Sequence, residues 1–141
     1  MSIYPDSSFF VSVYLTDQHT LEARRRVGAD PLIWITPLHV AEWGHAVEQN
    51  VFRNAISRRE ADRFIQLFQD DRRHGLWRET AFPDRAFERC AQLARQYAAR
   101  LGTRTLDSLH VASALELNAD EFWTFDRRQA KLARAAGLRA V

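Results

Sequence analysis

The sequence predicts an α/β fold in which helices flank a central, mainly parallel sheet. Short apolar segments typical of strands alternate with helical segments along the chain, which is the pattern of parallel α/β proteins. The 141 residues are 46% hydrophobic and 27% charged, as expected of one soluble globular domain. No linker, internal repeat or low-complexity segment interrupts the sequence, so we expect residues 1–141 to form a single domain.

Five short segments are predicted to be strands, namely residues 3–5, 32–36, 76–79, 121–125 and 138–141. The segment 32–36 is apolar on both faces, which favours a strand buried on both sides. Pro5 has no amide proton for a sheet ladder, so the first strand is expected to end there or to pair on one side only.

Helices are predicted to fill the intervals between strands. Their N-termini are marked by Ser7 or Ser8, Pro37 (with Thr36 before it), Ser57, Pro83, Thr103 or Thr105, and their C-termini by Gly28, Gly75, Gly102 and Gly137. Ser57 and Glu60 have the spacing of a capping box. The clearest helix runs from Pro83 to residue 101, because apolar residues recur there at 3.6-residue spacing. Further helices are predicted over residues 106–118 and 127–136.

Composition excludes several classes of protein. No uncharged stretch approaches the roughly 20 apolar residues that span a bilayer, and the N-terminus lacks the regions of a secretory signal. A lone Cys90 rules out an intrachain disulfide, so we expect a cytoplasmic protein with no membrane contact. The net charge is only +2, yet 19 of the 20 cations are arginine, whose planar fork suits phosphate. Charge alone does not argue for a nucleic-acid partner.

Four acidic residues lie where parallel α/β sheets bind ligands, beyond the carboxyl ends of the strands. Asp6 and Asp126 directly follow strands, Glu42 lies in the first turns of the helix after the second strand, and Asp107 lies near a helix N-terminus. Converging carboxylates repel one another unless a cation is present, and Mg²⁺ or Mn²⁺ prefers oxygen ligands. Such an ion activates water for attack on a phosphodiester. Taken alone, each acid is more often a turn or helix-cap residue than a metal ligand.

Four segments carry a family resemblance, namely YPDSS (4–8), AE (41–42), RTLDSLHVA (104–112), and TFD (124–126) followed by LA (132–133) and Gly137. Their order and spacing resemble those of PIN-domain proteins of the VapC toxin family, and the likeness covers nearly the whole chain. Pro5 departs from the aliphatic residue usual at that place. The resemblance implies a PIN-like three-layer sandwich with a central, mainly parallel sheet.

The resemblance also implies a function. VapC-like proteins are Mg²⁺- or Mn²⁺-dependent endoribonucleases that leave 5′-phosphate and 3′-hydroxyl ends, are neutralised by a VapB-like antitoxin, and commonly form homodimers. Carried over position by position, the resemblance implies that the catalytic, metal-binding acids are Asp6, Glu42, Asp107 and Asp126. Ser8 and Thr124 would orient carboxylates or water, or else serve only as caps or turn residues. Arg104, Arg127 and Arg128 would hold RNA phosphates, or else be solvated helix ends.

Other enzyme classes fit the sequence less well. A phosphatase of the haloacid dehalogenase type needs a second acid at position 8, which is serine, and a lysine ahead of Asp126, whereas Lys131 follows it. His39 and His45 are six residues apart, which places them on different sides of a helix and argues against a shared zinc ion. A catalytically silent domain that binds RNA or a protein partner remains an alternative. The RNA substrate cannot be read from the sequence.

Overall fold

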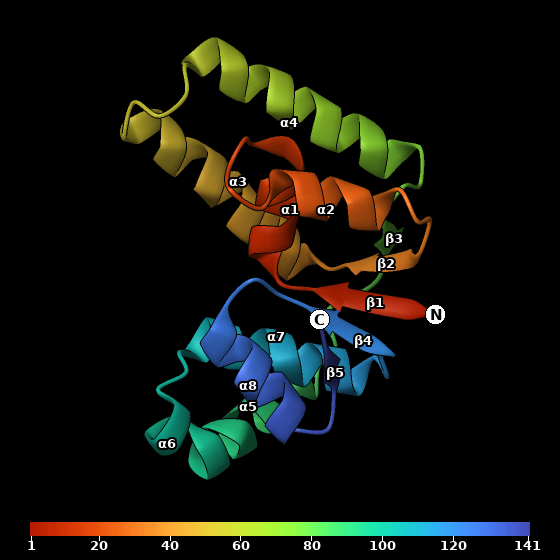
Figure 1. The fold of residues 1–141 in the computed structure, drawn as a ribbon, viewed down its shortest axis with the longest axis vertical. Coiled ribbons are helices and arrows are strands. Elements are labelled where there is room, and N and C mark those ends of the chain that lie inside the picture. The colour runs from red at the N-terminus through yellow and green to blue at the C-terminus, as the bar shows by residue number, and fades with distance from the viewer. The chain divides into compact units, whose positions relative to one another are not determined.

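The computed structural model describes residues 1–141 and divides into two compact units. One unit joins the two ends of the chain, residues 1–6 and 81–141, and the other contains residues 7–80. Figure 1 shows the ends meeting within the first unit, where the N-terminal strand lies beside a strand from near the C-terminus. Residues far apart in the sequence are therefore neighbours there.

The first unit contains three parallel strands and the helices that pack with them. Its elements are β1 (Ser2–Pro5), α5 (Ala86–Leu93), the π-helix η1 (Ala94–Ala98), α6 (Ala99–Leu101), α7 (Thr105–Glu116), β4 (Glu121–Trp123), α8 (Arg127–Ala135) and β5 (Arg139–Ala140). Strand β4 lies between β1 and β5, with Tyr4 opposite Phe122 and Phe122 opposite Ala140. The predicted parallel pairing is confirmed in this unit.

Pro5 ends β1 without breaking its pairing to β4. It lies opposite Trp123 in the parallel register, and the next residue, Asp6, donates its backbone N–H to the Trp123 carbonyl oxygen at 2.8 Å. The ladder thus continues past the proline, which itself has no donor. This bond fixes Asp6 directly at the carboxyl end of β1.

The predicted helix from Pro83 to residue 101 is wrong in two respects. Residues 83–86 form a turn in which Ala86 N–H bonds to the Pro83 carbonyl, so the helix begins at Ala86. The helix then widens into the π-helical turn η1 before it ends at Gly102, which has a left-handed backbone (φ 66°). Tyr97 in η1 donates its hydroxyl to the carbonyl of Ala135 at the end of α8.

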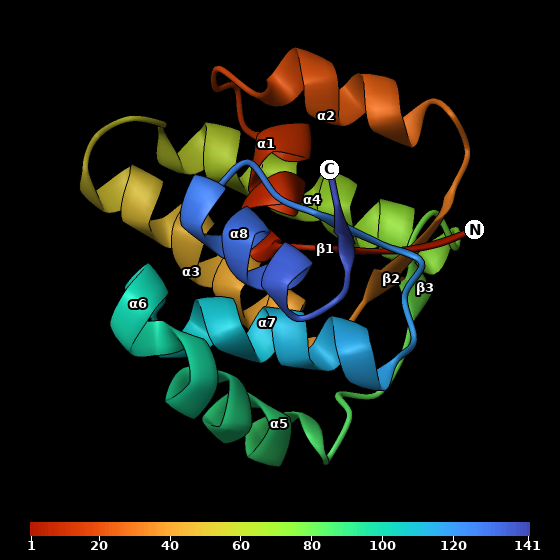
Figure 2. The same cartoon turned by 60° about the horizontal axis from the view of Figure 1, so that its bottom comes forward.

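Helix α7 lies at the centre of the first unit and packs along α5 (Figure 2). Residues 108–114 are all buried, which explains why this helix lacks a polar face. Cys90 on α5 is buried and donates to the Thr105 carbonyl, and burial raises the pKa of its thiol. The helix ends at Glu116, before the predicted residue 118, because Asn118 has a left-handed backbone (φ 52°).

The second unit contains two parallel strands and four helices. Its elements are α1 (Ser7–Tyr14), α2 (Thr20–Val27), β2 (Leu32–Ile35), α3 (Pro37–Phe52), α4 (Arg58–Arg73) and β3 (Arg78–Glu79). Strands β2 and β3 pair in parallel, with Trp34 opposite Arg78.

No helix in the chain is both long enough and apolar enough to cross a membrane.

Two capping predictions in the second unit are confirmed. Ser57 caps α4 by accepting the Glu60 N–H at 3.0 Å, and Glu60 accepts the Ser57 N–H at 2.7 Å. The second bond lowers the pKa of Glu60. Thr36 precedes Pro37 as predicted, and the ring of His39 accepts the Thr36 N–H.

The prediction that residues 32–36 are buried on both faces is wrong. Ile33 and Ile35 are buried, whereas Leu32 is 40% exposed. The strand is therefore buried mainly on one face, although its residues are apolar on both faces. The tryptophans instead supply much of the core, since Trp43 stacks on Phe68 with ring centroids 4.0 Å apart and Trp77 donates to the Tyr14 hydroxyl.

Candidate active site

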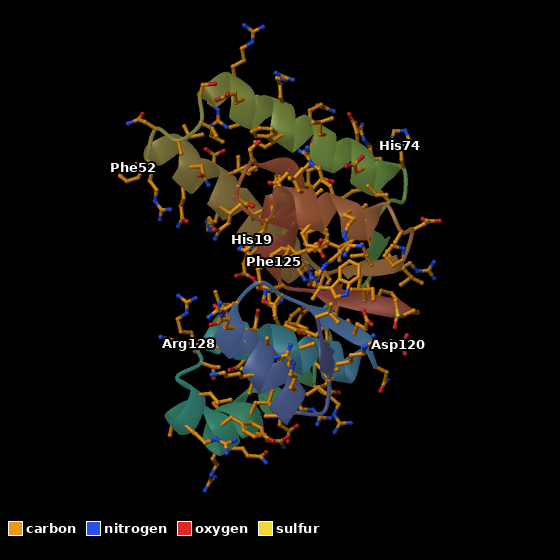
Figure 3. All side chains as sticks on the ribbon, in the orientation of Figure 1. His19, Phe52, His74, Asp120, Phe125 and Arg128 are labelled. Atoms are coloured by element: carbon orange, nitrogen blue, oxygen red, sulfur yellow. The ribbon has the colours of Figure 1, made fainter.

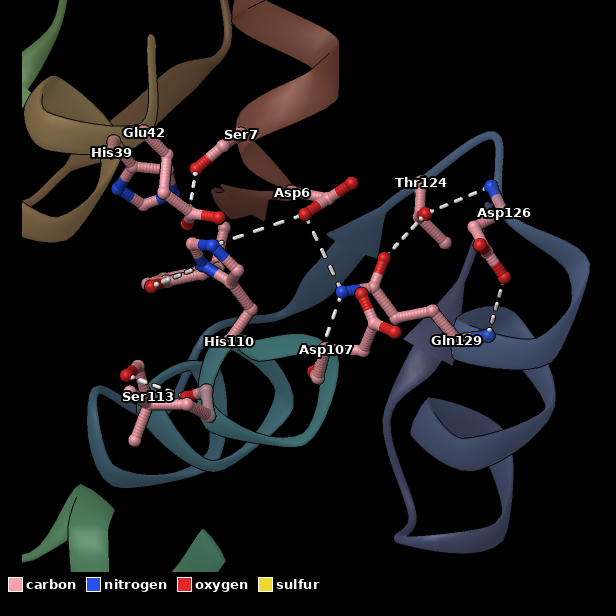
Figure 4. Close-up of polar contacts among 12 residues, drawn as sticks. Asp6, Ser7, His39, Glu42, Asp107, His110, Ser113, Thr124, Asp126 and Gln129 are labelled. Atoms are coloured by element: carbon pink, nitrogen blue, oxygen red, sulfur yellow. Dashed lines mark hydrogen bonds and ion pairs between the residues drawn. The ribbon is translucent and has the colours of Figure 1, made fainter. Parts of the chain in front are cut away.

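Asp6 occupies the end of β1, and a buried histidine lies beside it. Its side chain is 14% exposed, and Oδ1 lies 3.9 Å from Nε2 of His110 on α7 (Figure 4). The other ring nitrogen, Nδ1, shares a 3.1 Å hydrogen bond with the Tyr4 hydroxyl. His110 is therefore a buried, hydrogen-bonded residue. Because Tyr4 holds one side of the ring, the other nitrogen is kept facing the Asp6 carboxylate.

Asp107 lies in the first turn of α7, where the helix dipole favours a negative charge. Its Oδ2 accepts a hydrogen bond from Nε of Arg104 at 3.2 Å. Arg104 itself precedes the helix with an extended backbone and keeps its side chain 81% exposed. The predicted threonine cap is wrong, because Arg104 occupies the N-cap position. The Asp107 carboxylate therefore faces a solvent-exposed cation.

Asp126 caps α8. Its Oδ1 accepts the backbone N–H groups of Arg128 at 2.8 Å and Gln129 at 2.9 Å, while its own N–H donates to the Thr124 hydroxyl at 3.0 Å. The interpretation of this acid as a helix cap is confirmed. Since both accepted bonds use Oδ1, the second oxygen of the carboxylate is left for another partner. Capping and ligand binding are thus compatible at this residue.

The structure adds a residue that the sequence analysis missed, Gln129 on α8. Its side chain is fully buried, and Nε2 lies 3.4 Å from Asp6 Oδ1 and 3.3 Å from the Asp107 carbonyl oxygen. Its Oε1 accepts the Thr124 hydroxyl at 2.6 Å. The one available sequence signal is its place three residues before Leu132 on the inner face of α8, where an amide must find partners.

The charges of all three acids of the first unit act on the guanidinium of Arg104. The pKa of the Arg104 guanidinium is raised, first by its hydrogen bond to Asp107 and further by the charges of Asp126 and Asp6. An open pocket of about 600 Å³ adjoins this group, lined by Gly102, Arg104, Asp107, Phe125, Asp126, Arg127 and Arg128. Phe125 lies between β4 and α8, and Arg128 in the first turn of α8 (Figure 3). Acidic groups and cations therefore meet at one pocket.

Glu42 belongs to the second unit. It lies on α3, and its Oε1 accepts a 2.9 Å hydrogen bond from the hydroxyl of Ser7, the buried first residue of α1 (Figure 4). The sequence analysis treated Ser7 only as a possible cap, whereas the structure places it in the helix as a partner of Glu42. Ser8 is exposed. The assignment of Glu42 as a fourth metal-binding acid stays a prediction.

The acids have the oxygen ligands that a hard divalent cation prefers, but they do not form a preorganised metal site. No three acidic, histidine or cysteine side chains in the chain converge closely enough to form a metal site. Asp6, Asp107 and Asp126 nevertheless supply the carboxylate oxygens that Mg²⁺ and Mn²⁺ prefer. The Asp107 carboxylate accepts from the exposed Arg104, that of Asp126 accepts from helix N–H groups, and that of Asp6 lies beside His110 and the Gln129 amide. A cation of higher charge can replace Arg104 as the counter-ion of these acids.

Two substitutions of Asp126 separate its capping role from its charge. Asp126→Asn keeps a good cap and should leave the unfolding free energy nearly unchanged, whereas Asp126→Ala should lower it by about 1 kcal/mol. Both should reduce Mn²⁺ affinity, because both remove the carboxylate. Urea unfolding and Mn²⁺ titration measure the two effects. Retention of full Mn²⁺ affinity by Asp126→Asn would restrict this acid to its capping role.

Comparison with protein families gives a match over nearly the whole chain. A family model described as the PIN domain matches residues 3–135. Among curated proteins, none matches the sequence significantly.

Solved structures share the fold at low sequence identity. VapBC2 from Rickettsia felis, bound to a DNA fragment from their promoter, aligns with a TM-score of 0.69 and 14% identity, covering 100% of this chain and 98% of that chain. VapC20 of Mycobacterium tuberculosis, a sarcin–ricin loop cleaving toxin, aligns with a TM-score of 0.70 and 17% identity, covering 96% of this chain and 95% of that chain. FitAcB from Neisseria gonorrhoeae aligns with a TM-score of 0.68 and 18% identity, covering 98% of this chain and 95% of that chain. These likenesses confirm the PIN-like α/β fold with its parallel sheet.

Proposed function

This chain belongs to the PIN-domain family, and we propose that it is a Mg²⁺- or Mn²⁺-dependent endoribonuclease toxin of a toxin–antitoxin system. In this proposal it hydrolyses RNA phosphodiester bonds in the cytoplasm and leaves 5′-phosphate and 3′-hydroxyl ends. Asp6, Asp107 and Asp126 are the acids of the first unit that carry the activity.

One observation supports the proposal above the others: a single residue, Gln129, contacts all three acids. Its amide nitrogen lies near the Asp6 carboxylate and the Asp107 carbonyl, and its backbone N–H bonds to the Asp126 carboxylate. Gln129 thus connects residues after β1, at the start of α7 and before α8, although they are up to 120 positions apart in the sequence. Carboxylates brought near one another are unfavourable without a counter-ion, which a divalent metal would provide.

The residues around the pocket have distinct roles in this proposal. Asp6, Asp107 and Asp126 would hold the divalent ion, which when bound supplies a water of lowered pKa and charge stabilisation at the phosphate. Arg127 and Arg128, at the N-terminus of α8, contact RNA phosphates and fix the position of the strand without reading its sequence. Phe125, in the same pocket, offers a ring on which an unpaired base stacks.

The proposed protein partners follow from the relatives. Structural neighbours of the chain are toxins of toxin–antitoxin systems, among them VapBC2 and FitAcB. We therefore propose a VapB-like antitoxin as the neutralising partner and a homodimer as the state of the toxin. VapC20 is described as cleaving the sarcin–ricin loop, so ribosomal RNA is one substrate to test beside transfer RNA and messenger RNA.

Removal of divalent metal tests the proposed activity. Purified protein should cleave RNA in Mg²⁺ or Mn²⁺, lose the activity in excess chelator, and regain it when metal is restored. End-labelled RNA resolved by electrophoresis shows both the cleavage and the chemistry of the ends. Full activity in chelator would contradict the proposal. Absence of cleavage on ribosomal, transfer and messenger RNA in either condition would favour the catalytically silent alternative.

A further inference from the structure

Gln129 uses both ends of its side-chain amide inside the first unit. It is fully buried on α8, and its three side-chain hydrogen bonds reach Asp6 after β1, Asp107 on α7 and Thr124 after β4. A buried amide with unmatched groups is costly, so a satisfied one restricts the positions of its partners. Gln129 therefore links Asp6, the first turn of α7 and the loop after β4.

The orientation of the amide follows from the chemistry of its neighbours. Asp6 Oδ1 and the Asp107 carbonyl oxygen are both acceptors, so the group between them must be the NH₂ end. The Oε1 end then faces Thr124, whose hydroxyl donates its single proton to Gln129 and accepts the Asp126 N–H. A flipped amide would place an oxygen against two other oxygens with no proton between them.

From this arrangement we propose that Gln129 is a positioning residue for the acidic site. It holds the Asp6 carboxylate in register with the first turn of α7 and, through Thr124, with Asp126. The inference rests on the proposed function, and Gln129 is not itself a catalytic residue because it is buried beneath the acids. A neutral amide suits this task, since it orients the carboxylates without supplying a positive charge that would compete with the metal.

Gln129→Met tests the proposal because methionine keeps the length and approximate volume of the side chain, removes its side-chain hydrogen bonds, and leaves the backbone N–H bond to Asp126 in place. Isothermal titration with Mn²⁺ should show an affinity about 10- to 100-fold lower than wild type, as is typical when groups that orient metal ligands are removed. The kcat for RNA cleavage should fall, while KM changes little because the arginines at the pocket remain.

Two further variants keep the outcome interpretable. Ser113→Ala removes another buried hydrogen bond, to the Leu109 carbonyl on α7, and should lower stability without changing Mn²⁺ affinity. If Gln129→Met does not fold, Thr124→Val replaces it, since it removes the bond that orients Gln129. Wild-type Mn²⁺ affinity in the folded variant overturns the positioning role while the proposed function stands. Failure of the wild-type protein to bind Mn²⁺ overturns both.

Discussion

Replacing Asp6 with asparagine is expected to lower the rate of RNA cleavage by about a hundredfold to a thousandfold. The substitution preserves the shape of the side chain but removes the charge at the carboxyl end of β1, beside His110 and Gln129. A loss of this size is typical when one group that stabilises the transition state electrostatically is removed. Steady-state cleavage of a fluorescent RNA in Mn²⁺ measures it.

Asp6→Asn should lower the rate of RNA cleavage without lowering the stability of the fold. The melting temperature should not fall, because the variant relieves repulsion among neighbouring acids. Asp84→Asn is the matched control, since it makes the same chemical change at an exposed residue of the same unit. Cleavage by Asp6→Asn at a rate close to that of Asp84→Asn would show that Asp6 is not part of the catalytic site.

Trp77→Ala is expected to produce the largest loss of stability, about 3–5 kcal/mol in the free energy of unfolding. Trp77 is 2% exposed, contacts Phe10 edge-on at 5.1 Å between ring centroids, and donates its indole N–H to the Tyr14 hydroxyl. Truncation leaves a large cavity in the aromatic core of the second unit. Urea unfolding followed by circular dichroism measures the change.

An exposed aromatic residue of the same unit provides the control for this prediction. Phe52 is 87% exposed, so Phe52→Ala should change the unfolding free energy by no more than about 0.5 kcal/mol. If Trp77→Ala costs less than about 1 kcal/mol, then the aromatic cluster is not the main core of this unit.

Elements whose signals are local were predicted well from the sequence. The Ser57–Glu60 capping box and the Pro37 helix start depend on side chains within one turn, and both are confirmed. The end of β1 was also predicted, because Pro5 limits the strand by its own chemistry. Asp6 and Asp126 could be chosen as candidates because acids directly after parallel strands gather at one edge of a sheet, and Asp107 because it lies near a helix N-terminus.

Features that depend on contacts across the chain were not predictable. Gln129 is an ordinary residue for a helix surface, and only the approach of β1 and α7 to α8 makes it a buried link between acids. The π-helical turn in η1 falls inside an unbroken 3.6-residue pattern, so periodicity gave no sign of it. Likewise, the exposure of Leu32 depends on what packs against β2 rather than on its own apolar character.

The central claim is that Asp6, Asp107 and Asp126 share one divalent cation. Anomalous diffraction from crystals soaked in Mn²⁺ tests it most directly, because the anomalous signal locates the metal independently of activity. The account predicts a manganese peak within coordination distance of the Asp6 and Asp107 carboxylates, with the Arg104 guanidinium moved away from Asp107. A protein that cleaves RNA in Mn²⁺ but shows no such peak, or shows it only elsewhere on the surface, would contradict the account.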